Sequence, residues 1–387
     1  MDFDLTSDQI AILGRVRDFC DREVIPRAPQ YDLEEKFPWP LIEGLKELGL
    51  WGMIFPKRYG GQGLDMATYC LVLEELGRAD PSLALTVESH NSLCANHIYL
   101  AGDEEQKRAY LPRLTAGEAL GAWALTEPGA GSDAAGIISK SRLDGDHWIL
   151  NGAKTFTTQG SVAGIYVIFA CTGQSPGAKS ISAFVAEKGT PGLEIGKKEI
   201  KMGLRASDTA QLHLVDMKLP AKNLLGRQGR GFIDAMRILD GGRVGISGIS
   251  LGIARGAVEL GIRWVKPRKL RFGIDGSPGL TAAQKLLADL HAETEAVRLL
   301  VLKAATLLDR GAPFSHEASM AKLLSGELAM KASTLILDLL GPAGGSMDCP
   351  AQKFFRDAKL YQIGEGSSQI QELLIARRLL GDWEAGG

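Results

Sequence analysis

The pattern of hydrophobic and polar positions divides the chain into three parts. Over residues 1–118 apolar residues recur with helical spacing, as in the segment DQIAILGRVRDFC, and Ser7 is expected to cap this helix. A further helix is expected in the segment MATYCLVLEELGRA, with Gly77 near its end as the C-cap. This first part is therefore predicted to be an α-helical domain.

Over residues 119–230 the helical spacing gives way to short runs of β-forming residues. The runs YVIFACT, SISAFVAE and AQLHLVDMKLP are typical of strands, and Asp144-Gly145 and Asn151-Gly152 are expected turn dipeptides. No long helical stretch separates the runs, so alternating βαβ units are not expected. We predict an antiparallel sheet or small barrel.

Residues 231–387 return to long helical segments, several of them apolar on more than one face. Such helices are typical of a bundle interior or of a subunit interface. The predicted fold class is α+β but mostly α. It comprises an N-terminal α-helical domain, a middle antiparallel β-barrel or sheet domain, and a C-terminal four-helix bundle.

Composition and charge narrow the function classes. Hydrophobic residues make up 45% and charged residues 23% of the 387 residues, which excludes disorder across the chain. A net charge of −2 gives no field that attracts nucleic acid or an anionic membrane. The first residues lack the basic start and apolar run of a signal peptide, and no uninterrupted apolar stretch approaches the length of a membrane span. A cytoplasmic protein is expected.

Cysteine and histidine usage gives no sign of a metal site. No two cysteines are spaced as metal ligands or as a redox pair, and the six histidines form no HExxH pattern. Reduced, buried thiols are therefore expected, and no metal. The five cysteines are Cys20, Cys70, Cys94, Cys171 and Cys349.

The first candidate motif is the glycine-rich stretch Leu125–Asp133, LTEPGAGSD, at the change from helical to β texture. Glycines let a ligand approach the backbone closely, and free N–H groups suit a phosphate or a carbonyl. The stretch matches neither the P-loop nor the Rossmann pattern. By composition alone, an ordinary surface turn is the favoured interpretation of this stretch.

The second candidate motif places Glu365 between Gly364 and Gly366, just before an apolar helix. Ser368 and Gln371 are expected to form a capping box for that helix. A carboxylate in an apolar pocket has a raised pKa and is a competent general base. The alternative is that Glu365 only stabilises the N-terminus of the helix electrostatically.

Together the two motifs, ALTEPGAGSD and RDAKLYQIGEGSSQIQ, resemble the signatures of the acyl-CoA dehydrogenase family of flavoproteins. The resemblance covers essentially the whole chain, including NGAKTFTT, KMGLRASDT and IARRLLG, and short- and medium-chain members are most similar. It implies bound FAD and oxidation of an acyl-CoA thioester to the 2,3-enoyl-CoA. It also implies a homotetramer and an electron-transfer flavoprotein as electron acceptor. Glu365 matches the family's base, and its own N–H is the implied donor to the thioester carbonyl.

The resemblance assigns further residues to the site. The positions that match cofactor contacts are Trp123, Leu125, Thr126, Gly131, Ser132, Phe156, Thr158, Arg268, Phe272, Gln284, Gly341, Ser367 and Gln369. The positions that match contacts to the acyl-CoA are Ser132, Phe232, Met236, Asp240, Arg243 and Gly364.

The chain departs from the family pattern around the adenylate end of the cofactor. Arg268 stands one residue too far from Phe272, and Gln284 follows Phe272 by twelve residues where eight is usual. Asp338 and Pro342, on either side of Gly341, stand where the family has Gln and Gly. These departures leave the grip on the adenylate open to question.

Two departures concern the reacting end of the acyl group. Gly364 replaces a frequent Tyr, which is expected to enlarge the pocket for α-branched, cyclic or aromatic acyl groups, unless another side chain fills the space. Some family members carry the base next to the position of Arg243, but here that residue is Gly242. Glu365 is therefore the matching candidate for the base.

Two other functions remain open at this point. A family branch that also removes a carboxylate or sulfinate needs a cation in the pocket, and TVESHNSLCANHI contains no Arg, only His90 as a weak substitute. A non-catalytic acyl-CoA-binding scaffold is the second alternative, although the presence of Glu365 speaks against it. Bound flavin distinguishes an enzyme from a scaffold.

Overall fold

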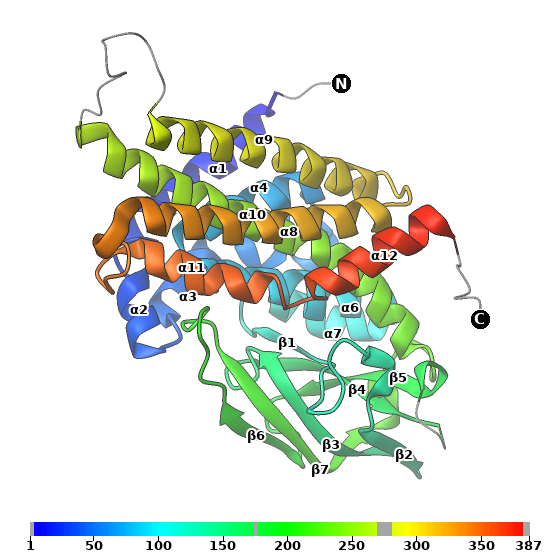
Figure 1. The fold of residues 1–387 in the computed structure, drawn as a ribbon. Coiled ribbons are helices and arrows are strands. Elements are labelled where there is room, and N and C mark those ends of the chain that lie inside the picture. Colours follow the sequence, from blue (N-terminus) through cyan, green and yellow to red (C-terminus); the bar gives the residue numbers. More distant parts are fainter. Residues whose placement is uncertain (1–3, 174–176, 269–280, 382–387) are drawn as a thin grey trace, which may run out of the picture.

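A computed structural model describes residues 4–173, 177–268 and 281–381. The elements follow the order expected from the sequence: helices, then strands, then long helices (Figure 1). The β domain lies below the helices in that view, and the C-terminal helices run across the front of the helical body. Residues from all three parts of the chain can therefore meet where the helices face the β domain.

The N-terminal helices begin at polar caps. Thr6, not Ser7, caps the first helix, because its side chain accepts the N–H of Gln9 while Gln9 bonds back in a capping box. Gly77 is not a C-cap but lies inside α4, where a Cβ would stand 2.6 Å from the carbonyl oxygen of Ile249. The helices are α1 (Ser7–Phe19), α2 (Ala28–Glu34), α3 (Trp39–Glu47), α4 (Met66–Ala79), α5 (Pro81–Glu88), α6 (Asn96–Ala101) and α7 (Glu104–Thr115), with π-helical segments η1 (Cys20–Val24) and η4 (Ser89–Ala95).

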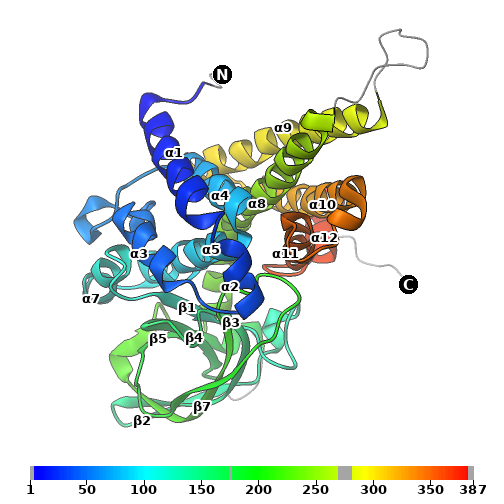
Figure 2. The same ribbon diagram turned by 90° about the vertical axis from the view of Figure 1, so that its left-hand side faces the viewer.

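The middle domain is an eight-stranded sheet in which strands run in the order β6-β7-β3-β2-β4-β5-β8, with β1 beside β4. Seen in Figure 2, it curves into a barrel-like shape around a core that contains Trp148, Tyr166 and Phe184. The strands are β1 (Gly121–Ala124), β2 (Lys140–Asp144), β3 (His147–Thr158), β4 (Ile165–Cys171), β5 (Ile181–Glu187), β6 (Leu193–Lys198), β7 (Thr209–Pro220) and β8 (Leu224–Leu225).

Two expectations about this sheet were wrong in detail. Asn151-Gly152 makes no turn: β3 continues through it, with a register irregularity against β7 between Leu150 and Gly152. The strand accommodates the extra residue as a β-bulge, so the chain does not reverse direction here. The sheet is also not purely antiparallel, because β1 pairs with β4 in parallel over four residues. The Asp144-Gly145 turn joins β2 and β3 as expected.

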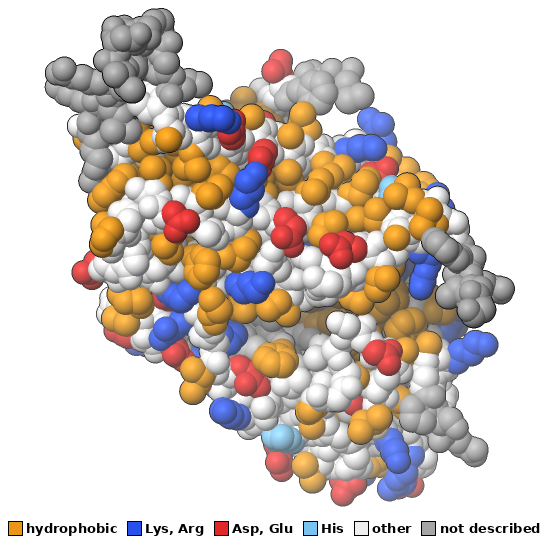
Figure 3. Space-filling model, in the orientation of Figure 1, with side chains coloured by type: hydrophobic (Ala, Val, Ile, Leu, Met, Phe, Trp, Pro, Cys, Tyr) orange, Lys and Arg blue, Asp and Glu red, His pale blue; other side chains and the backbone are white. Residues whose placement is uncertain are grey.

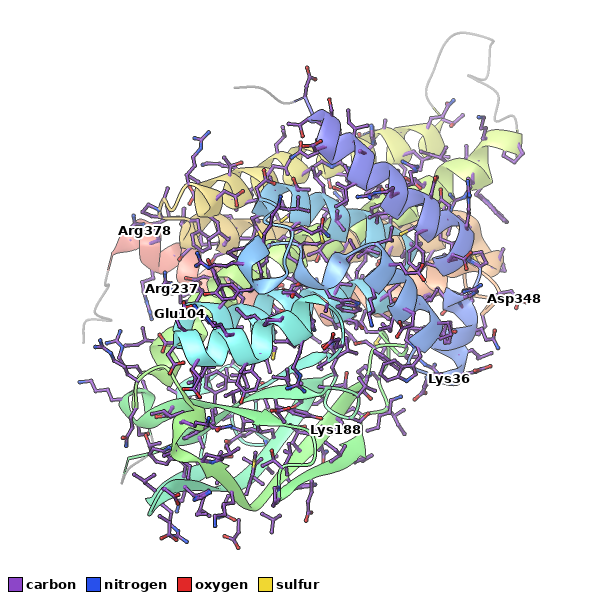
Figure 4. The ribbon with its side chains drawn as sticks, turned by 180° about the vertical axis from the view of Figure 1, so that it is seen from behind. Lys36, Glu104, Lys188, Arg237, Asp348 and Arg378 are labelled. Atoms are coloured by element: carbon purple, nitrogen blue, oxygen red, sulfur yellow. The ribbon has the colours of Figure 1, made fainter. Side chains whose placement is uncertain are left out.

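The C-terminal part packs the 35-residue α8 (Gly231–Val265) against α4 and α10. By length and hydropathy α8 could cross a membrane, but 78% of its apolar window is buried inside the protein, as in a core helix. Charged side chains such as Lys36, Lys188 and Arg378 are instead exposed at the surface of the molecule (Figure 4). The other helices are α9 (Ala282–Asp309), α10 (Ser315–Leu340), α11 (Pro350–Tyr361) and α12 (Ser368–Leu380).

The expected fold class is confirmed: a mostly helical protein with a middle β domain between helical parts. The domain boundaries after residues 118 and 230 stay predictions. Four of the five cysteines are buried, and Cys349 is half-buried. No group of three or more acidic, histidine or cysteine side chains that could hold a metal is found among the described residues.

Candidate active site

The loop that carries Glu365 joins α11 to α12 and is closed by its own backbone. The N–H of Gly364 donates to the carbonyl of Leu360 at 2.9 Å, and the N–H of Ser368 donates to the carbonyl of Gln362 at 3.0 Å. Glu365 has a φ of +54°, a conformation that side chains rarely adopt. Such strain persists where the surroundings enforce it, and it is frequent at functional sites.

The cap of α12 lies one residue earlier than expected. Ser367, not Ser368, is the N-cap, and its side chain accepts the N–H of Ile370. Gln371 donates from its side chain to the carbonyl of Gly366 at 3.1 Å. Ser368 instead donates to Glu327 of α10 at 2.7 Å. These contacts hold both ends of the short segment around Glu365.

A buried ion network fixes the helix that leads into this loop. Lys353 of α11 lies 2.7 Å from Asp80 and 2.6 Å from Asp357. Asp80 also caps α5, while Asp357 accepts the N–H of Leu204 from the β domain at 2.6 Å. Tyr361, at the end of α11, donates to the carbonyl of Pro81 at 2.9 Å. The network therefore ties α5, α11 and the β domain together next to Glu365.

The side chain of Glu365 points to a bare stretch of α8. A Cβ added to Gly242 would lie 2.7 Å from Oε2 of Glu365 and 3.6 Å from Oε1 of Glu88, at the end of α5. The carboxyls of Glu365 and Glu88 thus face the same glycine. Burial raises the pKa of Glu365, and the pKa of Glu88 is raised well above its ordinary value by burial and by the neighbouring Glu365.

Two cations act on Glu365. Burial lowers the pKa of Lys322 to about 8 and also lowers that of Arg243, and both side chains counteract the rise in the pKa of Glu365. Arg243 donates to Asp240 at 2.5 Å, so these two predicted acyl-CoA contacts lie together on α8. A carboxyl of raised pKa, close to cations yet buried, suits proton abstraction from a weak carbon acid.

The first motif folds into a tight loop between β1 and β2. Glu127 and Ala130 exchange backbone hydrogen bonds of 3.1 Å. Lys154 of β3 lies 2.7 Å from the carboxylate of Glu127, which also accepts the N–H groups of Ile138 and Ser139. Burial acts to raise the pKa of Glu127, but these partners hold it below its ordinary value. Glu127 therefore stabilises the conformation of this loop.

The exposed side of the loop is open to a ligand. No atom lies within 4 Å of a Cβ built on Gly131, and Ser132 beside it is exposed. The N–H of Thr155 donates to the carbonyl of Thr126, which brings Phe156 next to the loop. Phe156 has a φ of +51° and a 62% exposed ring. An exposed aromatic face beside a bare glycine loop fits a flat isoalloxazine ring and its phosphates.

The other positions predicted to contact the flavin differ in exposure. Leu125 is buried, and Thr158 is half-buried at the end of β3. Trp123 donates from its ring N–H to Nδ1 of His97 at 3.0 Å, so its polar edge is turned into the protein. Gln369 is exposed on α12. The hollow visible in Figure 3 between the C-terminal helices and the β domain contains hydrophobic side chains.

The expected acyl-CoA side lies along the first turns of α8. Phe232 and Met236 are half-buried and pack against the cluster that includes Leu125 and Phe169. Gly364 is exposed, and only the carbonyl oxygen of Leu360, at 3.5 Å, lies near a Cβ built on it. The described chain therefore leaves room for a side chain at position 364.

The expected adenylate contacts are only partly described. Phe272 and the side chain of Arg268 lie outside the described residues. Gln284 completes the capping box of α9 with Thr281. Gly341 follows the end of α10 with a φ of +60°.

His90 is not a substrate ligand in this arrangement. Its Nδ1 accepts the N–H of Gly121 at 3.0 Å, and Nε2 lies 3.2 Å from the carbonyl of Trp51. Burial lowers its pKa to about 4. Glu88, two residues before it, is the functional candidate that sequence reasoning missed. The available signal was a single acidic residue within the apolar run LALTV-E.

Comparisons with known proteins identify the family. Three family models match: acyl-CoA dehydrogenase, N-terminal domain (residues 6–118), middle domain (122–217) and C-terminal domain (229–380).

Similar full-length proteins are also known. The short-chain specific acyl-CoA dehydrogenase of Clostridium acetobutylicum is 42% identical over 98% of this chain and 100% of its own length. Butyryl-CoA dehydrogenase of Megasphaera elsdenii has a TM-score of 0.93 at 40% identity, covering 98% and 100% of the two chains.

A chain in a structure described for the electron transferring flavoprotein of Acidaminococcus fermentans has a TM-score of 0.93 at 42% identity, covering 99% and 100%. Similarity of this extent over the full length, together with three domain matches, assigns the family. The chain belongs to the acyl-CoA dehydrogenase family and is an FAD-dependent oxidoreductase that dehydrogenates acyl-CoA.

Proposed function

We propose that this protein oxidises a short acyl-CoA with Glu365 as the base that removes the α-proton. The observation that carries the proposal is the buried Oε2 of Glu365, which has no hydrogen-bond partner among the described residues and faces bare Gly242. A partnerless buried carboxyl is costly for folding alone, so its retention needs a functional reason. The short-chain and butyryl-CoA names of similar proteins support this substrate class.

In this proposal, the residues of the chain divide the work. FAD held at this site would supply the acceptor for the β-hydrogen, which leaves as hydride. The loop of Gly131 and Ser132 and the ring of Phe156 hold the flavin, while Phe232 and Met236 line the acyl group. The N–H of Glu365 hydrogen-bonds the thioester carbonyl, which stabilises the enolate as it forms. The strained loop keeps the Glu365 carboxylate aimed at the α-carbon.

The pocket is proposed to favour an acyl group without a second carboxylate. The sequence expectation relied on the absence of Arg, and the structure adds that His90 is neutral and already hydrogen-bonded. Glu88 adds a carboxyl beside Glu365 and offers no positive charge to a distal carboxylate. The open space at Gly364 is proposed to determine whether the pocket prefers a straight or a bulky acyl group.

Assembly and electron transfer complete the proposal. Exposed apolar residues of the C-terminal helices, among them Leu299, Leu324 and Leu373, suit a subunit interface, and a homotetramer is proposed. An electron-transfer flavoprotein is proposed as the acceptor, since a similar chain occurs in a structure described for such a protein. We also propose that the protein works in the cytoplasm.

The test is flavin reduction by butyryl-CoA without oxygen. Glu365→Gln is expected to stay yellow, bind FAD normally and lose about 10²–10⁴-fold of the reduction rate, because the base is gone and the shape is kept. Glu372→Gln, an exposed glutamate on α12, is the matched control and should reduce its flavin as the wild type does. A Glu365→Gln protein that bleaches at near the wild-type rate refutes the assignment.

A further inference from the structure

Glu88 is a buried acid for which the proposed reaction has no use. Neither of its carboxyl oxygens has a hydrogen-bond partner among the described residues, and the same is true of Oε2 of Glu365. Unpaired buried carboxyl oxygens are expensive, and three of them at one place need an explanation. The explanation has to involve both side chains, because they lie together.

Glycines on α8 bring the two acids together. Oε1 of Glu88 would lie 3.2 Å from a Cβ on Gly245 and 3.6 Å from one on Gly242, and Oε2 of Glu365 would lie 2.7 Å from the latter. One side chain at position 242 would therefore touch both carboxyls. Gly242 contributes no side chain between them, and the other neighbour of that Cβ position is the side chain of Leu93 at 3.2 Å.

The charged and titratable groups around the pair are distributed unevenly. Lys322 of α10 and Arg243 of α8 act on Glu365 and favour its ionised form. The groups that act on Glu88 are Glu365 itself and the hydroxyl of Ser92 in η4. The positive charge therefore lies on the Glu365 side of the pair.

Two tyrosines also face the pair. Tyr69 of α4 accepts a hydrogen bond from Ser92, and Tyr361 of α11 donates to Pro81. Burial and the charge of Glu88 raise the pKa of Tyr69 well above its ordinary value. Both phenols are therefore neutral, and neither supplies a charge that would ionise Glu88.

Two carboxylates so close in a buried site do not both ionise, because each disfavours the charge of the other. The pair therefore holds one proton at neutral pH. The positions of Lys322 and Arg243 determine which of the two carboxyls is ionised. We propose that Glu88 carries that proton and donates it to the Glu365 carboxylate, which makes Glu88 a positioning residue for the base. This inference rests on the role proposed for Glu365.

The shared proton accounts for two of the three unpaired oxygens, one on each carboxyl, and the second oxygen of Glu88 stays without a partner among the described residues. A hydrogen bond between an acid and a carboxylate is among the stronger ones. It also keeps Glu365 ionised despite its burial, since donation to the charged form favours that form. The α-proton then moves to Glu365, and Glu88 keeps its own proton throughout.

The first test is the acid limb of the pH profile for flavin reduction by butyryl-CoA. Glu88→Leu removes the donor and is expected to move the limb upward by about one pH unit or more, so that the rate below the limb falls about tenfold or more. Glu88→Gln keeps an N–H donor and should leave the limb close to its wild-type position. Glu372→Leu serves as the exposed control.

Two results overturn the proposal. A limb that moves to lower pH in Glu88→Gln would mean that Glu88 is ionised and repels the base. A limb that stays in place in Glu88→Leu would mean that Glu88 donates nothing to Glu365. If Glu88→Leu does not fold, the Glu88→Gln result and the measurement below still decide the question.

The second test uses no turnover. Infrared difference spectra of the resting holoenzyme, labelled with ¹³C-glutamate, should show one protonated carboxyl at neutral pH that vanishes in Glu88→Gln and persists in Glu365→Gln. The reverse pattern places the proton on Glu365 and overturns the proposal. Active Glu365→Gln would refute the proposed base separately, whatever the spectra show.

Discussion

Glu127 and Glu365 have a similar local sequence, a glutamate in a loop with glycines nearby. The side chains and backbone groups around the two carboxyls are nevertheless very different. The carboxylate of Glu127 has Lys154 at 2.7 Å and two backbone N–H donors. Oε2 of Glu365 is equally buried but has no partner, and a second acid faces it. The carboxylate of Glu127 holds its own loop in shape, whereas the described residues give Oε2 of Glu365 neither an ion pair nor a backbone donor.

The pKa shifts follow from this difference. Partners hold the pKa of Glu127 below its ordinary value, whereas burial raises that of Glu365. Glu127 is therefore a weak base that stabilises its loop. Glu365 stabilises its loop less and is the stronger base. Burial alone therefore does not identify a candidate functional carboxylate; a buried carboxyl without an ion pair or backbone donor among the described residues is the better indication.

The largest effect on stability is expected at the ion pair between Lys154 and Glu127. Lys154→Met leaves the carboxylate of Glu127 buried without its cation, which should lower the free energy of unfolding by about 3–5 kcal/mol. Urea unfolding measures this, with Lys197→Met on exposed β6 as the control. A loss below about 1 kcal/mol would show that the two N–H donors suffice and that the ion pair is dispensable.

Crowding the reactive carboxyl should have a smaller but specific effect. A methyl group at Gly242 would stand 2.7 Å from Oε2 of Glu365 and 3.2 Å from Leu93, so Gly242→Ala is expected to cost about 1–3 kcal/mol and to slow flavin reduction. At the adjacent Gly241 the nearest atom is 4.0 Å away. Gly241→Ala should therefore leave the rate unchanged, and equal slowing of both variants would contradict the geometry.

The open space at Gly364 gives a prediction about selectivity. Gly364→Tyr should shift the ratio of kcat/KM for butyryl-CoA over a cyclic or α-branched acyl-CoA by about tenfold in favour of the straight chain. Gly345→Tyr, at another exposed glycine, controls for general effects of the ring. The enlarged pocket is disproved if butyryl-CoA is already the best wild-type substrate and Gly364→Tyr only destabilises the protein.

The smallest effect is a pH dependence of stability. An acid whose pKa is raised by folding destabilises the native state above its unfolded pKa, and that penalty fades as pH falls below the folded pKa. Glu365→Gln should therefore be more stable than the wild type at pH 8, by about 1.4 kcal/mol for each unit of the shift, with a smaller gain near pH 5. Urea midpoints at both values measure it. A gain that grows on acidification has the wrong sign for a raised pKa.

The order of helical and β parts could be predicted from the sequence, because the spacing of hydrophobic residues changes from one part of the chain to the next. It misplaced details that depend on tertiary contacts. Gly77 has the composition of a helix end but allows α4 to approach α8, and Asn151-Gly152 is absorbed as a bulge in β3. Local propensity cannot distinguish these outcomes, because the deciding neighbours are distant in sequence.

For the site, motif resemblance supplied Glu365 and the flavin loop, but not the residues that surround the base. Glu88 and Lys322 lie 277 and 43 positions away from Glu365 along the chain, and neither belongs to a recognisable motif. Glu88 is the one charged residue of α5, whereas Lys322 is one of several charged residues of α10, so neither position by itself indicates its partner. Only the packing of α5, α8 and α10 around the loop brings them together.

The most direct test compares the two glutamates on the same scale, as the rate constant of flavin reduction per bound FAD in the wild type, Glu365→Gln and Glu127→Gln. The rate is predicted to fall at least about 100-fold in Glu365→Gln, with no loss of stability. Glu127→Gln should lower the unfolding midpoint, and it should change the rate per bound FAD by less than about tenfold. A larger rate loss in Glu127→Gln than in Glu365→Gln would contradict the account.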